Sequence, residues 1–266
     1  MKCLENLYVA IEHLSYNNIN FDIYLTDDNS HDGTWEAIKE KFPNVFLIKG
    51  DGYLYWCRGM INIWKYAIGK KDYDGFFWLN DDSYIYNNAI EIMLSTFKQT
   101  GNLSIISGAF ISELTGKVSY GGKINEKLLI PNGRLQNFVQ LNGNFVFISK
   151  CVFTRVGFLD NTFHHGYGDY DYGYRAIKLG INLYLTPTYV GVCERNVIII
   201  PNFFDNQYFI TKRFRYLYSP LGPSPIISFK FNIRHFSLIK ALLSFFSTNL
   251  MCLFPIIYRI RFLKNY

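Results

Sequence analysis

Two pairs of adjacent carboxylates in this 266-residue chain each follow a short apolar segment. Asp27 and Asp28 follow residues 21–26, and Asp81 and Asp82 follow residues 75–79. Such segments are typical of buried strands, and strand ends are where parallel-sheet enzymes carry their binding groups. A carboxylate of the first pair could accept a hydrogen bond from the N–H of a pyrimidine base. Alternatively, the first pair belongs to a capped turn before the next helix.

The second pair suggests metal chemistry. Neighbouring acids repel each other and resist burial unless a cation lies beside them, and a divalent metal that bridges a diphosphate would satisfy both. Oxygen ligands favour Mg²⁺ or Mn²⁺, so Asp81 and Asp82 are candidate metal ligands. The alternative is that one of these acids, or Asn80, caps the helix expected over 87–97.

A third acidic group lies among aromatic residues, in the segment 166–175. Asp169 would lie at the start of a helix, walled by tyrosines, and could act as a general base toward an acceptor hydroxyl. Burial among tyrosines raises the pKa of a carboxyl group and the helix N-terminus lowers it, so the net direction stays open. Alternatively, Asp169 caps the helix and Asp171 pairs with Arg175 at i, i+4.

The segments that position these groups alternate between helix and strand. Apolar spacing predicts helices over 4–11, 35–42, 61–68, 87–97, 150–156 and 168–179, and strands over 21–26, 45–48, 75–79, 103–107, 140–148 and 183–192. Residues 108–137 are rich in Gly, Ser, Lys and Asn, and we expect loops or a β-excursion there. The alternation predicts an α/β fold with a mainly parallel sheet covered by helices.

These motifs, in this order, resemble the family-2 glycosyltransferases of the GT-A fold over residues 1–195. The resemblance implies inverting, metal-dependent transfer of a hexose or deoxyhexose from a nucleotide sugar. It implies that Asp28 contacts the base with Asp27 nearby, and that Asp169 is the catalytic base. Asp82 would ligate Mn²⁺ or Mg²⁺, with Asp81 in the ribose or metal shell. Further implied residues are Arg58 at phosphate oxygens, and Asn142, Gly143, Asp171 and His165 in the donor-sugar and acceptor pocket.

Two features depart from the family pattern. Members usually open with an apolar strand, whereas this sequence begins at the helix that should follow it. We therefore expect a central strand to be missing, through a start site set too late or through truncation. The position after the last core strand is Cys193, where some relatives carry a histidine that completes the metal coordination. Metal binding would then depend on Asp82, the diphosphate and water.

Charge divides the chain near residue 205. Of the 27 Lys and Arg residues, nine lie in 206–266, which contains no Asp or Glu, so 18 basic and 21 acidic residues remain in 1–205. We expect a GT-A catalytic domain over 1–205 and a basic, apolar, helical tail over 206–266. Its segment 238–257 is borderline for a membrane span, and an interfacial helix or packing on the catalytic domain are the alternatives. So much aliphatic bulk suits an anionic membrane surface better than nucleic acid.

The cysteines are scattered and the first residues carry Glu5 and Glu12 in place of a secretion signal. We expect a cytoplasmic protein, peripheral on the inner face of the membrane. The expected function is sugar transfer from a nucleotide-sugar donor to a lipid-linked or saccharide acceptor, in biosynthesis of a bacterial surface polysaccharide. Two alternatives are a nucleotidyltransferase, which also uses metal-bound carboxylates, and a non-catalytic nucleotide-sugar-binding protein left by truncation.

Overall fold

The N-terminal part of the chain alternates helix and strand, as the sequence predicts. The computed structural model describes residues 1–16, 18–195 and 202–262. Its first elements are α1 (Lys2–Glu12), β1 (Tyr24–Asp27), α2 (Thr34–Lys41), β2 (Phe46–Lys49) and α3 (Tyr55–Lys70). β1 and β2 pair in parallel, and the Tyr24 and Phe46 rings stack across them with centroids 4.7 Å apart. Leu4 of α1 and Ile38 of α2 are buried against this pair.

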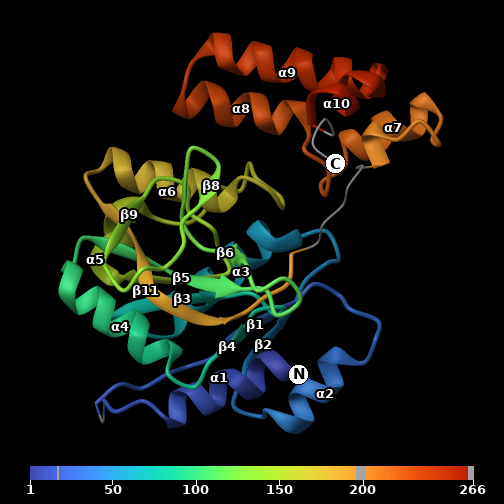
Figure 1. Cartoon of the computed structure of the whole chain (residues 1–266). Helices are drawn as coiled ribbons and strands as arrows, with labels where there is room; N and C mark the ends of the chain where they lie inside the picture. The colour runs from blue at the N-terminus through green and yellow to red at the C-terminus, as the bar shows by residue number, and fades with distance from the viewer. Residues whose placement is uncertain (17, 196–201, 263–266) are drawn as a thin grey trace.

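A second, seven-stranded sheet forms the centre of the molecule (Figure 1). Its main path runs β3 (Gly75–Leu79), β10 (Phe145–Ser149), β5 (Ser104–Ile111), β11 (Asn182–Val192) and β4 (Tyr84–Ile85). β6 (Val118–Tyr120) pairs with β5, and β9 (Gln136–Phe138) pairs with β11. β7 (Lys123–Ile124) and β8 (Lys127–Leu128) form a separate hairpin, so residues 112–138 are the predicted β-excursion.

The predicted α/β class is confirmed, but the sheet is mixed where we expected it to be mainly parallel. β5 and β11 are parallel, whereas β10 is antiparallel to both of its neighbours, β3 and β5. β3, β5 and β11 therefore run in one direction with β10 inserted against them. The physical reason lies in the connection from β5 to β10, which contains short strands and loops. A parallel return needs a crossover, usually a helix, and residues 112–144 contain none.

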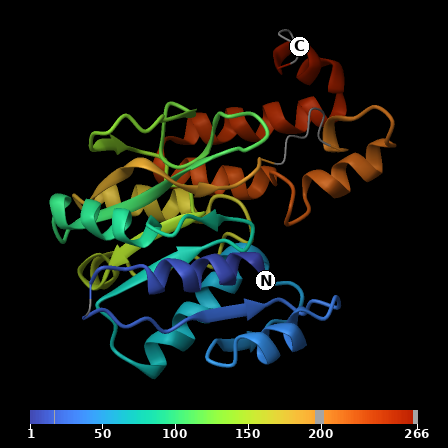
Figure 2. The ribbon, with the colours of Figure 1, turned by 60° about the horizontal axis from the view of Figure 1, so that its bottom comes forward.

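Helices cover both faces of this sheet. Successive strand residues point to opposite faces, and on β5 the side chains of Ile105 and Ile106 enter different cores. Ile105 packs with side chains of α3, α5 (Lys150–Val156) and α6 (Gly168–Lys178), among them Trp64 and Tyr172. Ile106 packs with α1 and with α4 (Ala89–Thr100). Figure 2 views the molecule with α1 in front. The result is a three-layer arrangement in which strand ends are left open for binding.

The two sheets are joined by side chains. β1 pairs only with β2 among the described strands, and β3 pairs only with β10. The Tyr24 and Tyr73 hydroxyls lie 2.6 Å apart, and Thr26 Oγ1 donates to the Gly59 carbonyl at 3.1 Å. Within the described residues, β1 and β3 belong to different sheets. The absence of a central strand between them stays a prediction.

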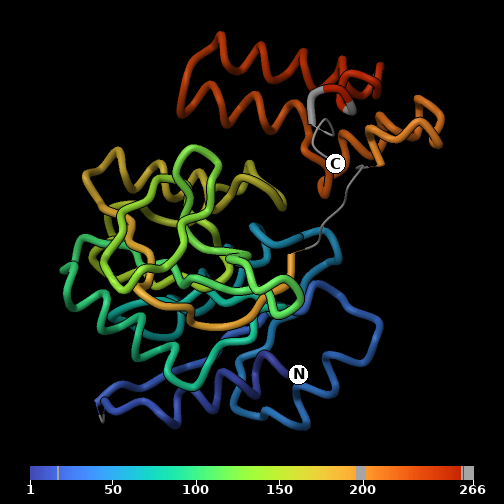
Figure 3. Tube along the Cα trace, in the orientation of Figure 1, coloured from blue at the N-terminus to red at the C-terminus, as the bar shows by residue number. Residues whose placement is uncertain are grey.

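The tail is helical and packs on the catalytic part through one helix. Its elements are the 3₁₀ turn η1 (Asn202–Phe204), α7 (Ile210–Leu217), α8 (Pro225–His235), α9 (Leu238–Leu253) and α10 (Pro255–Phe262). α8 lies beside α9 and faces α6, at the opposite end of the molecule from α1 and α2 (Figures 1 and 3). The apolar segment 238–257 is interrupted at Pro255. Within the described ranges, no helix has the length and apolarity needed to cross a bilayer.

Candidate active site

Asp28 organises the loop that precedes α3. Its Oδ1 accepts a hydrogen bond from the Gly52 N–H at 2.8 Å, and its Oδ2 accepts from the N–H groups of Leu54 and Tyr55 at 2.9 and 3.0 Å. A Cβ added at Gly50 would lie 2.4 Å from Asp28 Oδ1, so glycine permits this close approach. The carboxylate is thus engaged by backbone donors of its own chain.

One carboxylate oxygen of Asp27 is buried without a partner among the described residues. The residue is buried, its Oδ1 accepts from the Ser30 N–H at 2.9 Å, and its Oδ2 is buried without a hydrogen-bond partner among the described residues. An unpaired buried acceptor is costly unless a ligand donor meets it. The resemblance implied Asp28 as the base contact with Asp27 nearby. Asp28 already accepts from three backbone N–H groups, whereas Asp27 Oδ2 has no partner among the described residues.

Asp81 and Asp82 form the turn between β3 and β4. Both are exposed, and neither makes an ion pair with any residue that the structure describes. Desolvation by the surrounding protein, followed by the charge of Asp81, raises the pKa of Asp82. A bound cation would oppose both effects. Two adjacent hard oxygen donors without a cationic neighbour fit a divalent metal, although no third His, Cys, Asp or Glu among the described side chains completes a metal-binding group.

Two cysteines form hydrogen bonds with residues next to this turn. Cys193 is buried and accepts a 3.4 Å hydrogen bond from Asn144 Nδ2, while Cys3 Sγ donates to the Asn80 carbonyl at 3.3 Å. Burial raises the pKa of Cys193 to about 11 and that of Cys3 to about 12. In the absence of a bound metal, both thiols are therefore neutral at neutral pH. Cys193 stands where some relatives carry a histidine.

Asp169 lies in the first turn of α6 with both carboxylate oxygens in use. Its Oδ2 accepts from the Gly143 N–H at 3.0 Å and its Oδ1 from the Tyr170 N–H at 2.8 Å. Burial raises the pKa of Asp169 to about 6, and these hydrogen bonds and the charge of Lys123 hold it from rising further. The net shift of the Asp169 pKa, whose direction the sequence left open, is therefore upward. A carboxylate that titrates near neutrality can act as a general base.

Trp56 joins the three acidic groups into one site. It follows the loop that Asp28 holds, and its Nε1–H donates to Asn80 Oδ1 at 2.7 Å, directly before Asp81. A Cβ added at Gly143 would lie 2.5 Å from the Trp56 ring and 3.4 Å from Asp169 Cβ. The sequence did not single out Trp56, although an aromatic residue inside a glycine-rich approach segment was a usable signal.

The structure also describes the surroundings of three further predicted residues, Arg58, His165 and Asn142. Arg58 Nε donates to the Asn161 carbonyl at 3.3 Å and its charge lowers the pKa of His164, so it faces the loop before α6. His165 is exposed and lines a cavity beside that loop. Asn142 braces the turn, since its Oδ1 accepts from the Asn144 N–H at 3.4 Å.

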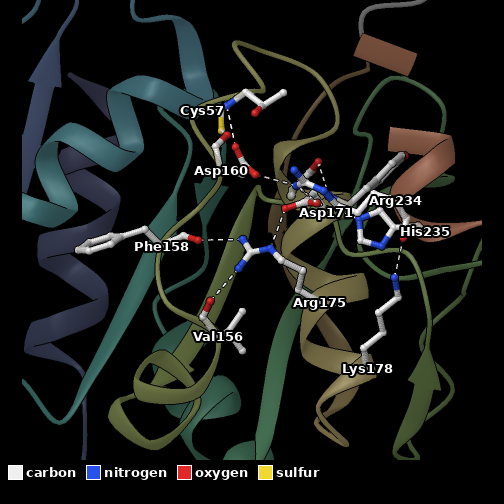
Figure 4. Close-up of polar contacts among 12 residues, drawn as sticks. Cys57, Val156, Phe158, Asp160, Asp171, Arg175, Lys178, Arg234 and His235 are labelled. Atoms are coloured by element: carbon white, nitrogen blue, oxygen red, sulfur yellow. Dashed lines mark hydrogen bonds and ion pairs between the residues drawn. The ribbon is translucent and has the colours of Figure 1, made fainter. Parts of the chain in front are cut away.

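Asp171 does not face a pocket, and its predicted place in the acceptor site is wrong. Its side chain is fully buried and accepts hydrogen bonds of 2.8 Å from Arg175 Nε, Arg234 Nη1 and His235 Nε2 (Figure 4). The alternative i, i+4 pair with Arg175 is confirmed. Sequence reasoning missed Arg234 and His235, whose charge in a largely apolar tail was the available signal.

Positive φ values gather in the loops of the site. Asn29, Tyr55 and Tyr167 have φ of 62°, 53° and 70°, and each lies within two residues of Asp28, Trp56 or Asp169. Left-handed backbone at non-glycine residues costs on the order of 1–3 kcal/mol and persists where surrounding contacts hold it. These three strained residues therefore lie in the same segments as Asp28, Trp56 and Asp169.

The mixed α/β fold with acids at its strand ends is the architecture expected of the GT-A class. Residues 2–163 match the family described as glycosyl transferase family 2, and the chain belongs to this family. No curated protein matches the sequence.

Two solved structures are similar at low identity. One is GalNAc-T7 with UDP, GalNAc and Mn²⁺, with 12% identity and a TM-score of 0.49 over 97% of this chain and 54% of that chain. The other is the mannosyltransferase PcManGT from Pyrobaculum calidifontis in complex with GDP-Man and Mn²⁺, with 12% identity and a TM-score of 0.49 over 99% and 83%. The chain thus spans about half the length of GalNAc-T7. Similarity at this level identifies neither substrate nor mechanism.

Proposed function

We propose that this glycosyltransferase moves a hexose or deoxyhexose from a nucleotide sugar to an acceptor hydroxyl by metal-assisted, inverting displacement. The observation that carries the proposal is the pair of contacts at Trp56: its Nε1–H donates to Asn80, directly before Asp81 and Asp82, and its ring lies against Gly143, whose N–H donates to Asp169. Each acid is chemically distinct: one has a free buried oxygen, one is exposed beside a second acid, and one titrates near neutrality.

Donor binding falls to the first two acidic pairs. Asp27 Oδ2 would accept from an N–H of the nucleobase, and the loop that Asp28 holds would form the wall of the nucleotide site. Asp82, with Asp81, would hold Mg²⁺ or Mn²⁺. When bound, the cation supplies positive charge that stabilises the departing nucleoside diphosphate.

Asp169 would serve as the base. Its carboxylate takes the proton of the acceptor hydroxyl while the acceptor oxygen forms a bond to the anomeric carbon. The bond from that carbon to the phosphate oxygen breaks, and the nucleoside diphosphate leaves with the electron pair. Attack from the face opposite the leaving group inverts the anomeric configuration.

Hydrolysis of a panel of UDP-, GDP- and dTDP-sugars, with Mn²⁺ or with EDTA, tests this proposal. We expect wild type to hydrolyse at least one donor only with metal, and Asp82→Asn to lower that rate by about a hundredfold. Asp72→Asn, at an acid with 78% exposure remote from the site, serves as control. Metal-dependent nucleotide binding in calorimetry without any turnover would instead favour a non-catalytic nucleotide-sugar-binding protein.

We also propose that the tail docks on an anionic membrane and that the acceptor is delivered there, as in surface-polysaccharide assembly. Large apolar side chains of α9 recur at helical spacing and stay exposed, including Ile239, Leu243, Phe246 and Leu250 at 71, 67, 63 and 47%. The tail contains no acid to oppose an anionic surface. The side chains of Arg259, Arg261 and Lys264, which add to the predicted basic charge, lie outside those described.

A further inference from the structure

A cavity of about 210 Å³ separates the loop before α6 from the segment that links α7 to α8. Residues 164–167 form one wall. The other wall comes from the tail, with Tyr218, Ser219 and Pro223 in the linker and Ile226 in the first turn of α8. The catalytic part and the tail therefore build this cavity together.

The catalytic wall presents polar side chains that have no hydrogen-bond partner among the described residues. The rings of His164 and His165 and the hydroxyl of Tyr167 make no hydrogen bond to any residue that the structure describes. Desolvation by the surrounding protein lowers the pKa of both histidines, so each imidazole is neutral at neutral pH and offers one donor and one acceptor. No carboxylate is among the residues that line the cavity. Such groups suit neutral hydroxyls better than a cation.

The remaining lining is flat and apolar. The Tyr167 and Tyr218 rings, two prolines and two isoleucines contribute to it, and Tyr218 Oη donates to Asn249 Oδ1 at 2.8 Å, which fixes its ring. Aromatic faces beside a few convergent polar groups are the composition of small-molecule sites. A single pyranose ring, with apolar faces and equatorial hydroxyls, matches both halves of this lining.

Contacts along α8 hold the tail wall in place. The Phe231 ring lies 4.8 Å from the Tyr167 ring between centroids, and the last turn of α8 is fixed to Asp171 by Arg234 and His235 (Figure 4). The linker is closed by hydrogen bonds from the Ser224 N–H to the Leu217 carbonyl and from the Gly222 N–H to the Ser219 carbonyl. The cavity is therefore preformed, which lowers the entropy cost of binding.

We propose that this cavity binds a pyranose ring of the saccharide acceptor, so that the tail contributes directly to acceptor recognition. Tyr167 lines the cavity and is followed at once by Gly168 and Asp169 on α6, so the cavity lies beside the segment that carries the proposed base. This inference rests on the proposed function, and its new content is that residues 218–227 supply acceptor specificity.

Saturation-transfer NMR with a panel of methyl hexopyranosides and methyl deoxyhexopyranosides, at millimolar concentration, tests the inference. Ile226→Trp fills the cavity from the tail side. Ile233→Trp is the matched control, because both isoleucines lie on α8 with 48% exposure and Ile233 does not line the cavity. We expect at least one glycoside to bind wild type and the control, and its affinity for Ile226→Trp to fall by about tenfold or more. His165→Ala, a truncation of an exposed side chain, is expected to weaken binding of the same glycoside.

Failure of this inference is distinguishable from failure of the proposed function. Donor hydrolysis without acceptor is measured on wild type and on Ile233→Trp, and the two rates are expected to be equal. Glycoside binding that ignores both Ile226→Trp and His165→Ala, or the absence of any glycoside signal while donor hydrolysis persists, would overturn the cavity assignment alone. Loss of metal-dependent donor hydrolysis in wild type would overturn the proposed function.

Discussion

Nε2 of His235, in the last turn of α8, lies 2.8 Å from the carboxylate of Asp171 in the first turn of α6, and both side chains are fully buried. Arg234 bonds the same Asp171 oxygen and also Asp160 Oδ2, at 2.7 Å. The helix that carries the proposed base is thus joined by buried charge to a helix of the tail. α8 packs against the helix that carries the proposed base, whereas α9 carries the exposed apolar side chains Ile239, Leu243 and Phe246.

Replacing Asp171 with Asn is expected to destabilise the protein by about 3 kcal/mol, because it removes the buried counter-charge of Arg175 and Arg234 and the carboxylate that His235 Nε2 contacts. Urea denaturation measures this loss. Asp72→Asn removes an exposed ion pair and is expected to cost less than about 1 kcal/mol. Equal losses for the two variants would contradict the assigned role of Asp171.

The stability of the protein at low pH is expected to depend on Asp171. Its partners lower the pKa of Asp171 to about 2 from an ordinary 3.8. Because the folded value is depressed, the stabilisation is complete above the unfolded value and disappears as pH falls through the folded one. Wild type is therefore expected to lose stability between about pH 4 and pH 2 more steeply than Asp171→Asn, measured by denaturation at each pH.

The pH dependence of transfer is expected to follow Asp169. Since its pKa is raised to about 6, kcat/KM should fall on the acid side with a single ionisation near that value. Lys123→Met removes a charge that lowers this pKa, and we expect the acidic limb to move to higher pH. Asp169→Asn should abolish the acidic limb of the pH profile and lower the rate by about a hundredfold. An acidic limb unaffected by Lys123→Met would argue against Asp169 as the titrating base.

Gly143→Ala is expected to reduce donor hydrolysis strongly, because its Cβ would lie 2.5 Å from the Trp56 ring, which must then leave Asn80. Overpacking of this kind costs about 1–3 kcal/mol, and thermal unfolding measures it. Gly69→Ala on α3 is the matched control, since a Cβ there meets nothing within 4 Å. We expect it to stabilise the helix by about 0.5–1 kcal/mol. Wild-type rates for both variants would remove Trp56 from the site.

Membrane docking is expected to depend on α9. Leu243→Asp places a charge on the exposed apolar face and should reduce sedimentation with vesicles that contain anionic lipid. Leu114→Asp, at a leucine with 84% exposure in the catalytic part, should sediment as wild type does. Binding should weaken with salt and with zwitterionic vesicles. Concentration-dependent dimerisation of wild type that Leu243→Asp abolishes, without vesicle binding, would identify a second copy as the partner.

Local sequence pattern determined the elements and most of the candidate site. The strand Gly75–Leu79 and the helix Lys150–Val156 have the predicted bounds, and Asp81 and Asp82 lie at the expected strand end. Periodicity, caps and turn residues act over a few positions, so one sequence suffices to read them. The same locality explains why the Asp171–Arg175 pair, one helical turn apart, was foreseen as an alternative.

Only the tertiary structure decided the relationships between distant segments. The direction of β10 depends on which strands it meets, and the Asp28 carboxylate accepts from backbone donors more than 20 positions away. Asp171 and His235 are 64 positions apart, and no period or motif connects them. Burial and hydrogen-bond saturation follow from packing, and packing brings together residues whose sequence separation carries no local signal.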